Sequence, residues 1–189
     1  MAPTSSRPTT RPVKTREDFL SLPDHVRAEL IHGELYVTPA PRRTHQRTLL
    51  RLSRILAEQV DQLSGELFLA AHDVFLPSGD IVQPDLMYVG AEQAGISRED
   101  GIHGVPRLVI EIISPAVPER DRVIKRSLYE RNGVPEYWMV EPEDEGIQLL
   151  CLRQQRFKPH GWFTTGTVLH SRAVPGLSVP IDGLFPSQA

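Results

Sequence analysis

The chain of 189 residues has few cysteines, no long apolar run and little net charge, and each of these excludes a class of protein. Its one cysteine, Cys151, excludes an internal disulfide framework and a zinc site built from several cysteines. It has no run of about 18 apolar residues and no apolar segment of the signal-peptide kind near its start. We therefore expect a cytoplasmic protein that neither crosses nor attaches to a membrane. The net charge of -3 argues against a large basic surface, although a local basic patch remains compatible with it.

What the chain does have is the composition of a globular protein, with 40% hydrophobic and 24% charged residues. Its length suits one domain that buries roughly 70% of the surface of the unfolded chain. Residues 1–14 are rich in Pro, Ser, Thr and Arg, so we expect a flexible tail there and a single domain over residues 15–186.

Hydrophobic spacing predicts helices and strands in alternation. Helices are expected at a capped turn from Thr15 and over residues 22–31, 44–63 and 119–132. Strands are expected over 34–38, 67–76, 81–89, 107–113 and 136–140, and as a C-terminal set over 147–152, 156–163, 168–171 and 174–181. Residues 77–80 are expected to join two strands as a hairpin. The order strand, helix, strand over 107–140 favours a parallel pair.

Two strands each carry a single carboxylate among apolar residues. Asp85 follows Pro84 in the middle of the expected strand 81–89, and Glu111 interrupts the apolar run 108–113. A buried ionised carboxylate is costly unless it meets a hydrogen-bonded partner, a proton or a metal ion. The two strands therefore indicate one shared site. The plainer alternatives are that Asp85 ends a strand or caps a turn, and that Glu111 pairs with a buried arginine such as Arg107 or Arg122.

Other charged residues recur at helical spacing. Asp121, Lys125 and Tyr129 lie at i, i+4 and i+8, so the ammonium group of Lys125 could reach Glu111, or could form an exposed salt bridge with Asp121. A stripe of arginines follows one face of the helix 44–63. It could bind phosphates outside the site or form a solvated helix face, and it consists of Arg47, Arg51 and Arg54, with Arg42 and Arg43 before it.

The chain also contains several short sequence motifs in a fixed order. These are Glu29-Leu-Ile-His-Gly-Glu34-Leu-Tyr-Val, Pro39 with His45, Pro84-Asp85-Leu-Met-Tyr-Val, Leu108-Val-Ile-Glu111-Ile-Ile-Ser114-Pro115, Asp121 with Lys125 and Tyr129, and Gly133-Val-Pro-Glu-Tyr-Trp138. Over residues 17–152 this order resembles the Uma-two family, whose fold is that of the PD-(D/E)XK nucleases. The resemblance implies an α/β, restriction-endonuclease-like mixed sheet flanked by helices, here with additional C-terminal strands.

The resemblance also implies roles for individual residues. Asp85 and Glu111 would be the metal ligands for Mg²⁺ or Mn²⁺, which prefer oxygen donors. The superfamily usually has a lysine where this chain has Ile113, so Lys125 would replace it. Glu34, His45 and Tyr129 are further candidates for the site. The chain departs from the family pattern at Ala28 and His32. These departures affect the match in the N-terminal part of the site, not at Asp85 or Glu111.

Together with the buried carboxylates, the resemblance implies a metal-dependent endonuclease that hydrolyses nucleic acid through Asp85, Glu111 and Lys125, and it favours DNA as the polymer. Two alternatives stay open. The first is a catalytically silent module that binds nucleic acid or a protein, and the second is a hydrolase of a smaller phosphate ester. The edges of the C-terminal strands could also support a homodimer.

Overall fold

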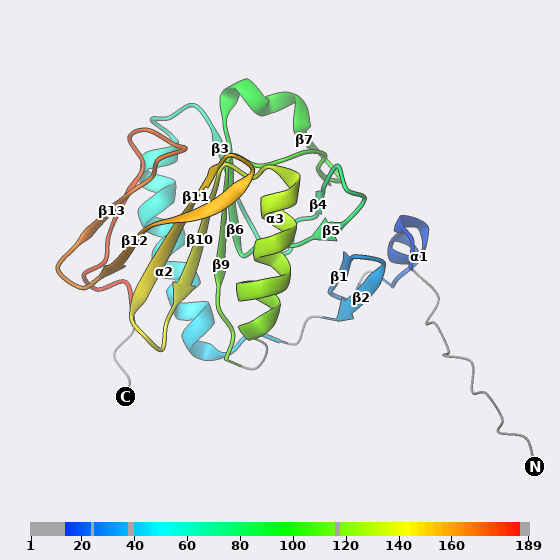
Figure 1. Cartoon of the computed structure of the whole chain (residues 1–189), viewed down its shortest axis with the longest axis horizontal. Helices are drawn as coiled ribbons and strands as arrows, with labels where there is room; N and C mark the ends of the chain where they lie inside the picture. Colours follow the sequence, from blue (N-terminus) through cyan, green and yellow to red (C-terminus); the bar gives the residue numbers. More distant parts are fainter. Residues whose placement is uncertain (1–13, 24, 38–39, 116–117, 186–189) are drawn as a thin grey trace, which may run out of the picture.

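The computed structural model describes residues 14–23, 25–37, 40–115 and 118–185. The mixed α/β fold expected from the sequence is confirmed (Figure 1). The helices are α1 (Arg16–Leu20), α2 (Arg43–Val60), the 3₁₀ helix η1 (Ala91–Ile96), the π-helical stretch η2 (Arg120–Lys125) and α3 (Arg126–Asn132). None of the helices in these ranges is long and apolar enough to cross a membrane.

The central sheet has six strands in the order β12-β11-β10-β9-β6-β3. Their bounds are β3 (Glu66–Leu69), β6 (Leu86–Val89), β9 (Leu108–Ile112), β10 (Glu136–Glu141), β11 (Gly146–Arg153) and β12 (Arg156–Thr164). Strands β9 and β10 are parallel, and the other neighbours are antiparallel. The continuous helix formed by η2 and α3 connects β9 to β10, so the predicted crossover is confirmed.

A second sheet of six short strands lies beside the first, in the order β2-β1-β5-β4-β8-β7. Its strands are β1 (Ala28–Ile31), β2 (Glu34–Val37), β4 (Val74–Phe75), β5 (Ile81–Val82), β7 (Ser97–Arg98) and β8 (Gly101–Ile102). Near the C-terminus, β13 (Val168–His170) and β14 (Ser178–Pro180) form a two-stranded ribbon.

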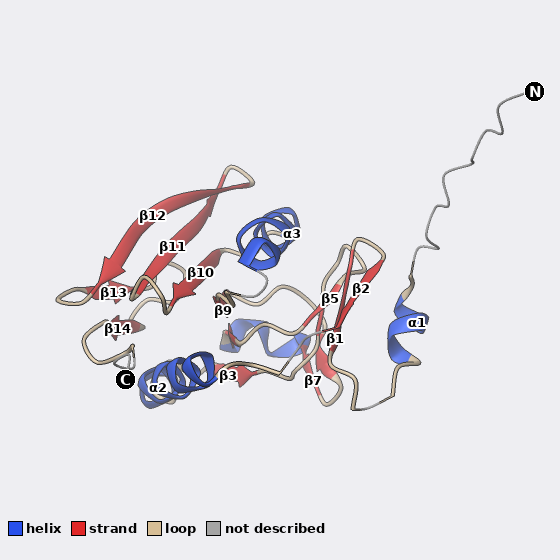
Figure 2. Ribbon diagram, turned by 90° about the horizontal axis from the view of Figure 1, so that it is seen from below, coloured by secondary structure: helices blue, strands red, loops and turns tan. Residues whose placement is uncertain are grey.

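Helices α2 and α3 lie on opposite faces of the central sheet (Figure 2). Strand β9 contributes side chains to the apolar layers on both faces of the sheet, because successive side chains of a strand point to opposite faces. Leu108, Ile110 and Ile112 pack in the cluster that contains α2, whereas Val109 and Ile113 pack in the cluster that contains α3. The alternation that the sequence predicted is confirmed, and Glu111 therefore faces the α3 side.

Helix α2 forms because Leu49, Leu52, Leu56 and Val60 recur at helical spacing and become buried against the central sheet. Helix α3 ends where Gly133 adopts the left-handed conformation, with φ of 82°, and closes the last turn. At the N-terminus of the domain, Thr15 and Asp18 form the predicted capping box of α1.

The prediction of a helix over residues 22–31 is wrong. Leu22, Val26 and Leu30 do pack in one cluster, with Phe19, but the chain from Ala28 is the strand β1. It pairs with β2 and with β5, and these long-range backbone hydrogen bonds outweigh the helical spacing. His32 and Gly33, with φ of 53° and 73°, form the tight turn between β1 and β2.

The predicted hairpin over 67–89 forms, but each arm is divided between the two sheets. The inner pair β4–β5 belongs to the second sheet, and the outer pair β3–β6 belongs to the central sheet. The arm expected as one strand over 81–89 breaks at Gln83 and Pro84. Asp85 was expected in the middle of a strand. It lies instead directly before β6.

Three smaller differences concern loops and ends. The expected loop 91–106 contains η1 and the β7–β8 hairpin, and the expected strand 174–181 is reduced to β14. The tail expected over 1–14 lies outside the described residues except for Lys14, whose backbone N–H donates a hydrogen bond to the carbonyl of Gly33 at 2.8 Å.

Candidate active site

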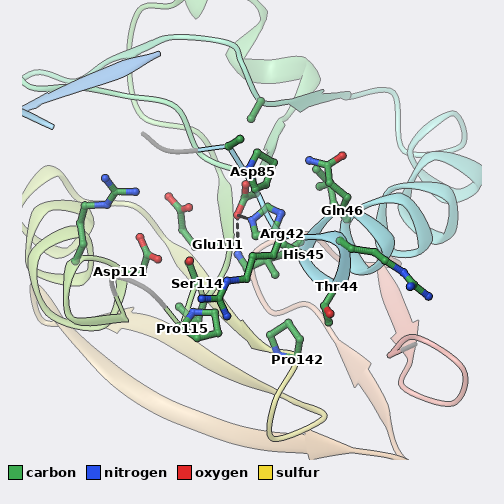
Figure 3. A pocket seen from close by; sticks show the side chains of 18 of the residues that line it. Arg42, Thr44, His45, Gln46, Asp85, Glu111, Ser114, Pro115, Asp121 and Pro142 are labelled. Atoms are coloured by element: carbon green, nitrogen blue, oxygen red, sulfur yellow. Dashed lines mark hydrogen bonds and ion pairs between the residues drawn. The ribbon is translucent and has the colours of Figure 1, made fainter. Parts of the chain in front are cut away.

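A cavity of about 440 Å³ opens where β9 ends, between the first turn of α2 and the η2 segment (Figure 3). Its walls come from segments far apart in the sequence: residues 27–29, 40–49, 83–85, 111–115, 120–125 and 142–143 each contribute lining side chains. Asp85, Glu111 and Lys125 all line this cavity. The structure thus brings together the three residues that the sequence singled out.

Asp85 is held at the edge of the β6–β9 ladder. Leu86, the residue after Asp85, pairs with Ile110, the residue before Glu111. Pro84 has no N–H to donate to a ladder, and β6 begins two residues later at Leu86. The Oδ2 atom of Asp85 accepts a hydrogen bond from the backbone N–H of Ile112 at 2.8 Å, and His45 Nε2 lies 3.0 Å from the same oxygen. The carboxylate therefore has a fixed orientation.

Glu111 is buried and receives two hydrogen bonds on one oxygen. Lys125 Nζ donates to Glu111 Oε1 at 2.8 Å, and the hydroxyl of Tyr129 donates to the same atom at 2.6 Å. The predicted alignment of Lys125 and Tyr129 towards Glu111 matches this geometry. The arginines considered as its partners are engaged elsewhere, since Arg107 pairs with Glu92 and Arg122 pairs with Glu141.

Glu29 is the acidic neighbour that the sequence interpretation missed. It lies in β1, is 1% exposed, and its Oε1 atom is 2.8 Å from Lys125 Nζ. The backbone N–H of Gln83 donates to the same oxygen at 2.9 Å. The signal was present, because Glu29 interrupts an apolar run as Glu111 does, but the assignment of this segment to a helix concealed it.

Burial and charge determine the protonation of this cluster. Burial raises the pKa of Glu111 to about 8, and the attraction of Lys125 offsets only part of this effect. Burial also raises the pKa of Asp121. For Lys125, burial alone would lower the pKa, but the charges of Glu111 and Glu29 more than compensate and raise it. Burial, followed by the charge of Glu111, raises the pKa of Tyr129, so the phenol keeps its proton and acts as a donor.

The remaining predicted residues are placed as follows. His45 lines the cavity from α2, whereas Glu34 is exposed, accepts a hydrogen bond from Tyr36, and does not line it. The arginine stripe divides: Arg47 lines the cavity together with Arg42 and Arg43. Arg51 instead donates to the carbonyl of Gly183 at 2.8 Å, and Arg54 lines a separate groove between α2 and β3.

The free oxygens of the cluster suit a hard divalent cation. Within the described ranges, no donor reaches Asp85 Oδ1 or Glu111 Oε2, because the hydrogen bonds involve Oδ2 and Oε1. The same ranges contain no group of three or more His, Cys, Asp or Glu side chains arranged around one ion. Two carboxylates, completed by water and substrate, are a ligand set that Mg²⁺ accepts, whereas a closed structural zinc site needs more protein ligands.

Comparison with known proteins agrees with this geometry. Residues 16–182 match the model of the Uma2 family, which is described as "Putative restriction endonuclease". The chain belongs to the Uma2 family. A solved structure from Anabaena variabilis ATCC 29413, described as a putative nuclease belonging to DUF820, superposes with a TM-score of 0.75 and 18% identity over 90% of this chain and 97% of that chain. No curated protein matches the sequence.

At 18% identity, the match to the solved structure establishes the fold, and the family model establishes membership of Uma2. The restriction-endonuclease-like fold and the family expected from the sequence are therefore confirmed.

Proposed function

We propose that this Uma2 protein is a metal-dependent endonuclease that hydrolyses phosphodiester bonds in nucleic acid, with DNA as its substrate. The observation that carries the proposal is the meeting of Asp85 and Glu111 in one cavity, each with one oxygen held by donors and the other without a donor among the described residues. Carboxylates fixed in this way are suited to holding Mg²⁺ or Mn²⁺.

The side chains around the two carboxylates have distinct roles in this proposal. Lys125 and Tyr129 orient Glu111 through its Oε1 atom, and the N–H of Ile112 and the ring of His45 orient Asp85. A bound divalent ion would polarise the scissile phosphate and provide hydroxide from water. The positive charge of Lys125 also reduces the repulsion between Glu111 and Glu29, which lets the carboxylates share so small a space.

A polymeric substrate is supported by the charge around the cavity. Arg42, Arg43 and Arg47 line it from the start of α2, beside a carboxylate cluster that would otherwise repel a phosphodiester. Arginines bind phosphate oxygens well because their planar donors match them. The net charge of -3 then describes the whole surface rather than this local patch.

The test is cleavage of supercoiled plasmid and of single-stranded DNA in Mg²⁺, Mn²⁺ or EDTA. Wild type is compared with Glu111→Ala and with Glu66→Ala, an exposed position on β3 that serves as a control, all purified identically. We expect metal-dependent cutting by wild type and Glu66→Ala, and a loss of about 100-fold or more for Glu111→Ala, as is usual when a group that positions the reaction is removed.

The other outcomes separate the alternatives. Equal cutting by all three proteins would indicate a contaminating nuclease and would contradict the proposal. Cleavage of bis(p-nitrophenyl) phosphate without cleavage of DNA would favour a hydrolase of smaller esters. Binding of DNA without cleavage in either metal would favour the catalytically silent module.

A further inference from the structure

Two arginines of the cavity wall have donors without a partner. Arg27 precedes β1, Arg120 begins η2, and both line the cavity. The Nε atom of each is buried and has no hydrogen-bond partner in the part of the chain that the structure describes. Burying a charged donor without an acceptor is unfavourable, so these positions need an explanation.

Glu29 lies near Arg120 without satisfying it. Its Oε2 atom is 4.0 Å from Arg120 Nε, which is beyond hydrogen-bond distance, and this oxygen is also buried and unpartnered. The side chain of Glu29 is 2% exposed and that of Arg120 is 13% exposed. The guanidinium group thus lies close enough to be attracted by Glu29, while its Nε–H has no acceptor among the described residues.

Nearby arginines with structural roles behave differently. Arg122, two residues beyond Arg120, donates two N–H groups to the carboxylate of Glu141, and Arg156 bonds Glu130 at 2.9 Å. Their acceptors belong to the protein. For Arg27 and Arg120 no described residue supplies an acceptor for Nε, and an anion with several oxygens suits guanidinium groups that line a cavity.

A second positive wall lies across the carboxylates. Arg42, Arg43 and Arg47 line the cavity at the start of α2, where the first turn has no acidic residue and Arg42 provides no side-chain cap. Figure 3 shows Asp121 of η2 on one side of Glu111, and Arg42 and His45 on the far side of it. The carboxylate of Glu111 therefore lies between residues of η2 and the basic start of α2.

The lining also indicates which part of a nucleic acid is bound. No Phe, Tyr or Trp is among the described residues that line the cavity, so it offers no aromatic surface on which a base could stack. Five arginines line it instead: Arg27, Arg42, Arg43, Arg47 and Arg120. This composition suits the backbone of a strand rather than its bases.

We propose that the cavity binds three consecutive phosphates of one nucleic-acid strand, an inference that rests on the proposed nuclease function. The middle phosphate lies at Asp85 and Glu111. One neighbouring phosphate is bound by Arg27 and Arg120, and the other by the arginines at the start of α2. The substrate is then a strand that continues on both sides of the cut bond, and the cavity is indifferent to base sequence.

The first experiment measures binding of a fluorescent single-stranded DNA by anisotropy in Ca²⁺ over a range of salt concentrations. We expect Arg27→Met and Arg120→Met each to weaken binding by about tenfold, the loss typical of one charged hydrogen bond. Each should also reduce the steepness of the salt dependence by about 0.7, the contribution of one phosphate contact on a single strand. Arg122→Met is the matched control and should bind as wild type does.

The second experiment needs no variant, so a folding defect cannot affect it. Unlabelled TpT, with one phosphate, and TpTpTpT, with three, compete for the labelled strand on wild-type protein. We expect the tetranucleotide to compete at least tenfold better. Equal competition by the two, or wild-type binding by both arginine variants, would overturn the inference.

The result also distinguishes this inference from the nuclease proposal. If the arginine variants lose binding but wild type does not cut DNA in Mg²⁺ or Mn²⁺, the phosphate sites stand and the nuclease proposal fails. If wild type cuts DNA and both arginine variants bind and cut equally well, the nuclease proposal stands and the phosphate sites fail.

Discussion

The buried charges around Lys125 are the most unusual feature at the scale of single residues. Lys125, Glu29 and Glu111 are each 3% exposed or less, and Lys125 Nζ lies 2.8 Å from both carboxylates. Such groups rarely increase stability over well-packed apolar residues, because desolvation opposes their attraction. A site that must hold carboxylates in a fixed orientation gives a reason for keeping them.

Replacing Lys125 by Met should destabilise the protein strongly. The change leaves Glu29 and Glu111 facing each other without a cation, and breaking a buried pair in this way typically costs about 3–5 kcal/mol. Urea unfolding measures the loss. The double variant Glu29→Gln with Lys125→Met should recover part of it, because one carboxylate is then neutral. A loss below about 1 kcal/mol for Lys125→Met would show that the pair contributes little.

The raised pKa of Glu111 predicts how the metal-free protein responds to pH. In the unfolded chain Glu111 ionises near 4.5, whereas in the folded protein its pKa is about 8. The folded state therefore binds the Glu111 proton more tightly than the unfolded chain does. The stability that this proton contributes is present at low pH and is lost as the pH rises from 4.5 to 8.

Urea unfolding in EDTA across this range, compared with Glu111→Gln, isolates the effect. The free energy of unfolding should fall with increasing pH more steeply for wild type than for Glu111→Gln, which has no proton to lose at this position. Parallel pH profiles for the two proteins would contradict the assignment.

At this scale the sequence predicted most of the cluster but not all of it. Helical spacing places Lys125 and Tyr129 on one face of a helix, and strand alternation gives the face of Glu111. Both are local properties that can be read from the sequence. Glu29 could not be related to Lys125 in the same way, since their contact depends on how the β1–β2 hairpin docks beside η2. The same limit applies to Glu34, whose proximity to Glu29 in sequence does not bring it to the cavity.

At the scale of elements, the secondary-structure predictions are wrong where pairing with distant strands decides the conformation of a segment. Residues 22–31 have helical spacing, yet β1 forms because β2 and β5 offer backbone partners on both sides. The arm 81–89 has the composition of one strand, yet it passes from the second sheet to the central sheet at Pro84. Helices α2 and α3 were predicted well, because each has a regular apolar face and a clear end.

The end of α3 gives a prediction at this scale. Gly133 has φ of 82°, and a Cβ atom there would meet nothing within 4 Å, so replacing it by Ala would change backbone strain alone. We expect Gly133→Ala to reduce the free energy of unfolding by about 1 kcal/mol, the usual cost of a left-handed Ala.

Gly95→Ala is the control for this substitution. Gly95 also has open space around it but has no left-handed φ, so its replacement should leave stability within about 0.5 kcal/mol of wild type. Chemical denaturation of the two variants beside wild type makes the comparison. An equal effect of both substitutions would contradict the role of Gly133 as the helix terminator.

At the scale of the whole molecule, the cavity depends on complete folding. Its walls come from both sheets, from the start of α2 and from η2, and no two neighbouring elements contain the whole cluster. Local opening of the β1–β2 hairpin would remove Glu29 and Arg27 together. Cavity formation and global stability should therefore be closely linked in this fold.

The outer edge of the central sheet bears on the expected homodimer. Strand β12 has hydrogen-bonded partners only on its β11 side in the described sheet, but it contains Lys158 and Pro159, and the β11–β12 register shifts between Leu149 and Leu150. A lysine, a proline and a bulge are devices that oppose pairing between sheet edges. A homodimer would then form by packing of side chains rather than by addition of strands.

Trp162 and Val168, each 45% exposed, are the apolar side chains available for such packing near this edge. We expect a mass near twice 21.2 kDa in light scattering, and we expect Trp162→Lys to shift it towards that of a single chain. Leu50→Lys, at a 59% exposed position on α2, is the control and should not change the mass. A mass of 21.2 kDa for wild type at high concentration would mean that the edge-protecting features of β12 operate in a monomer, and that one cavity acts alone on one strand.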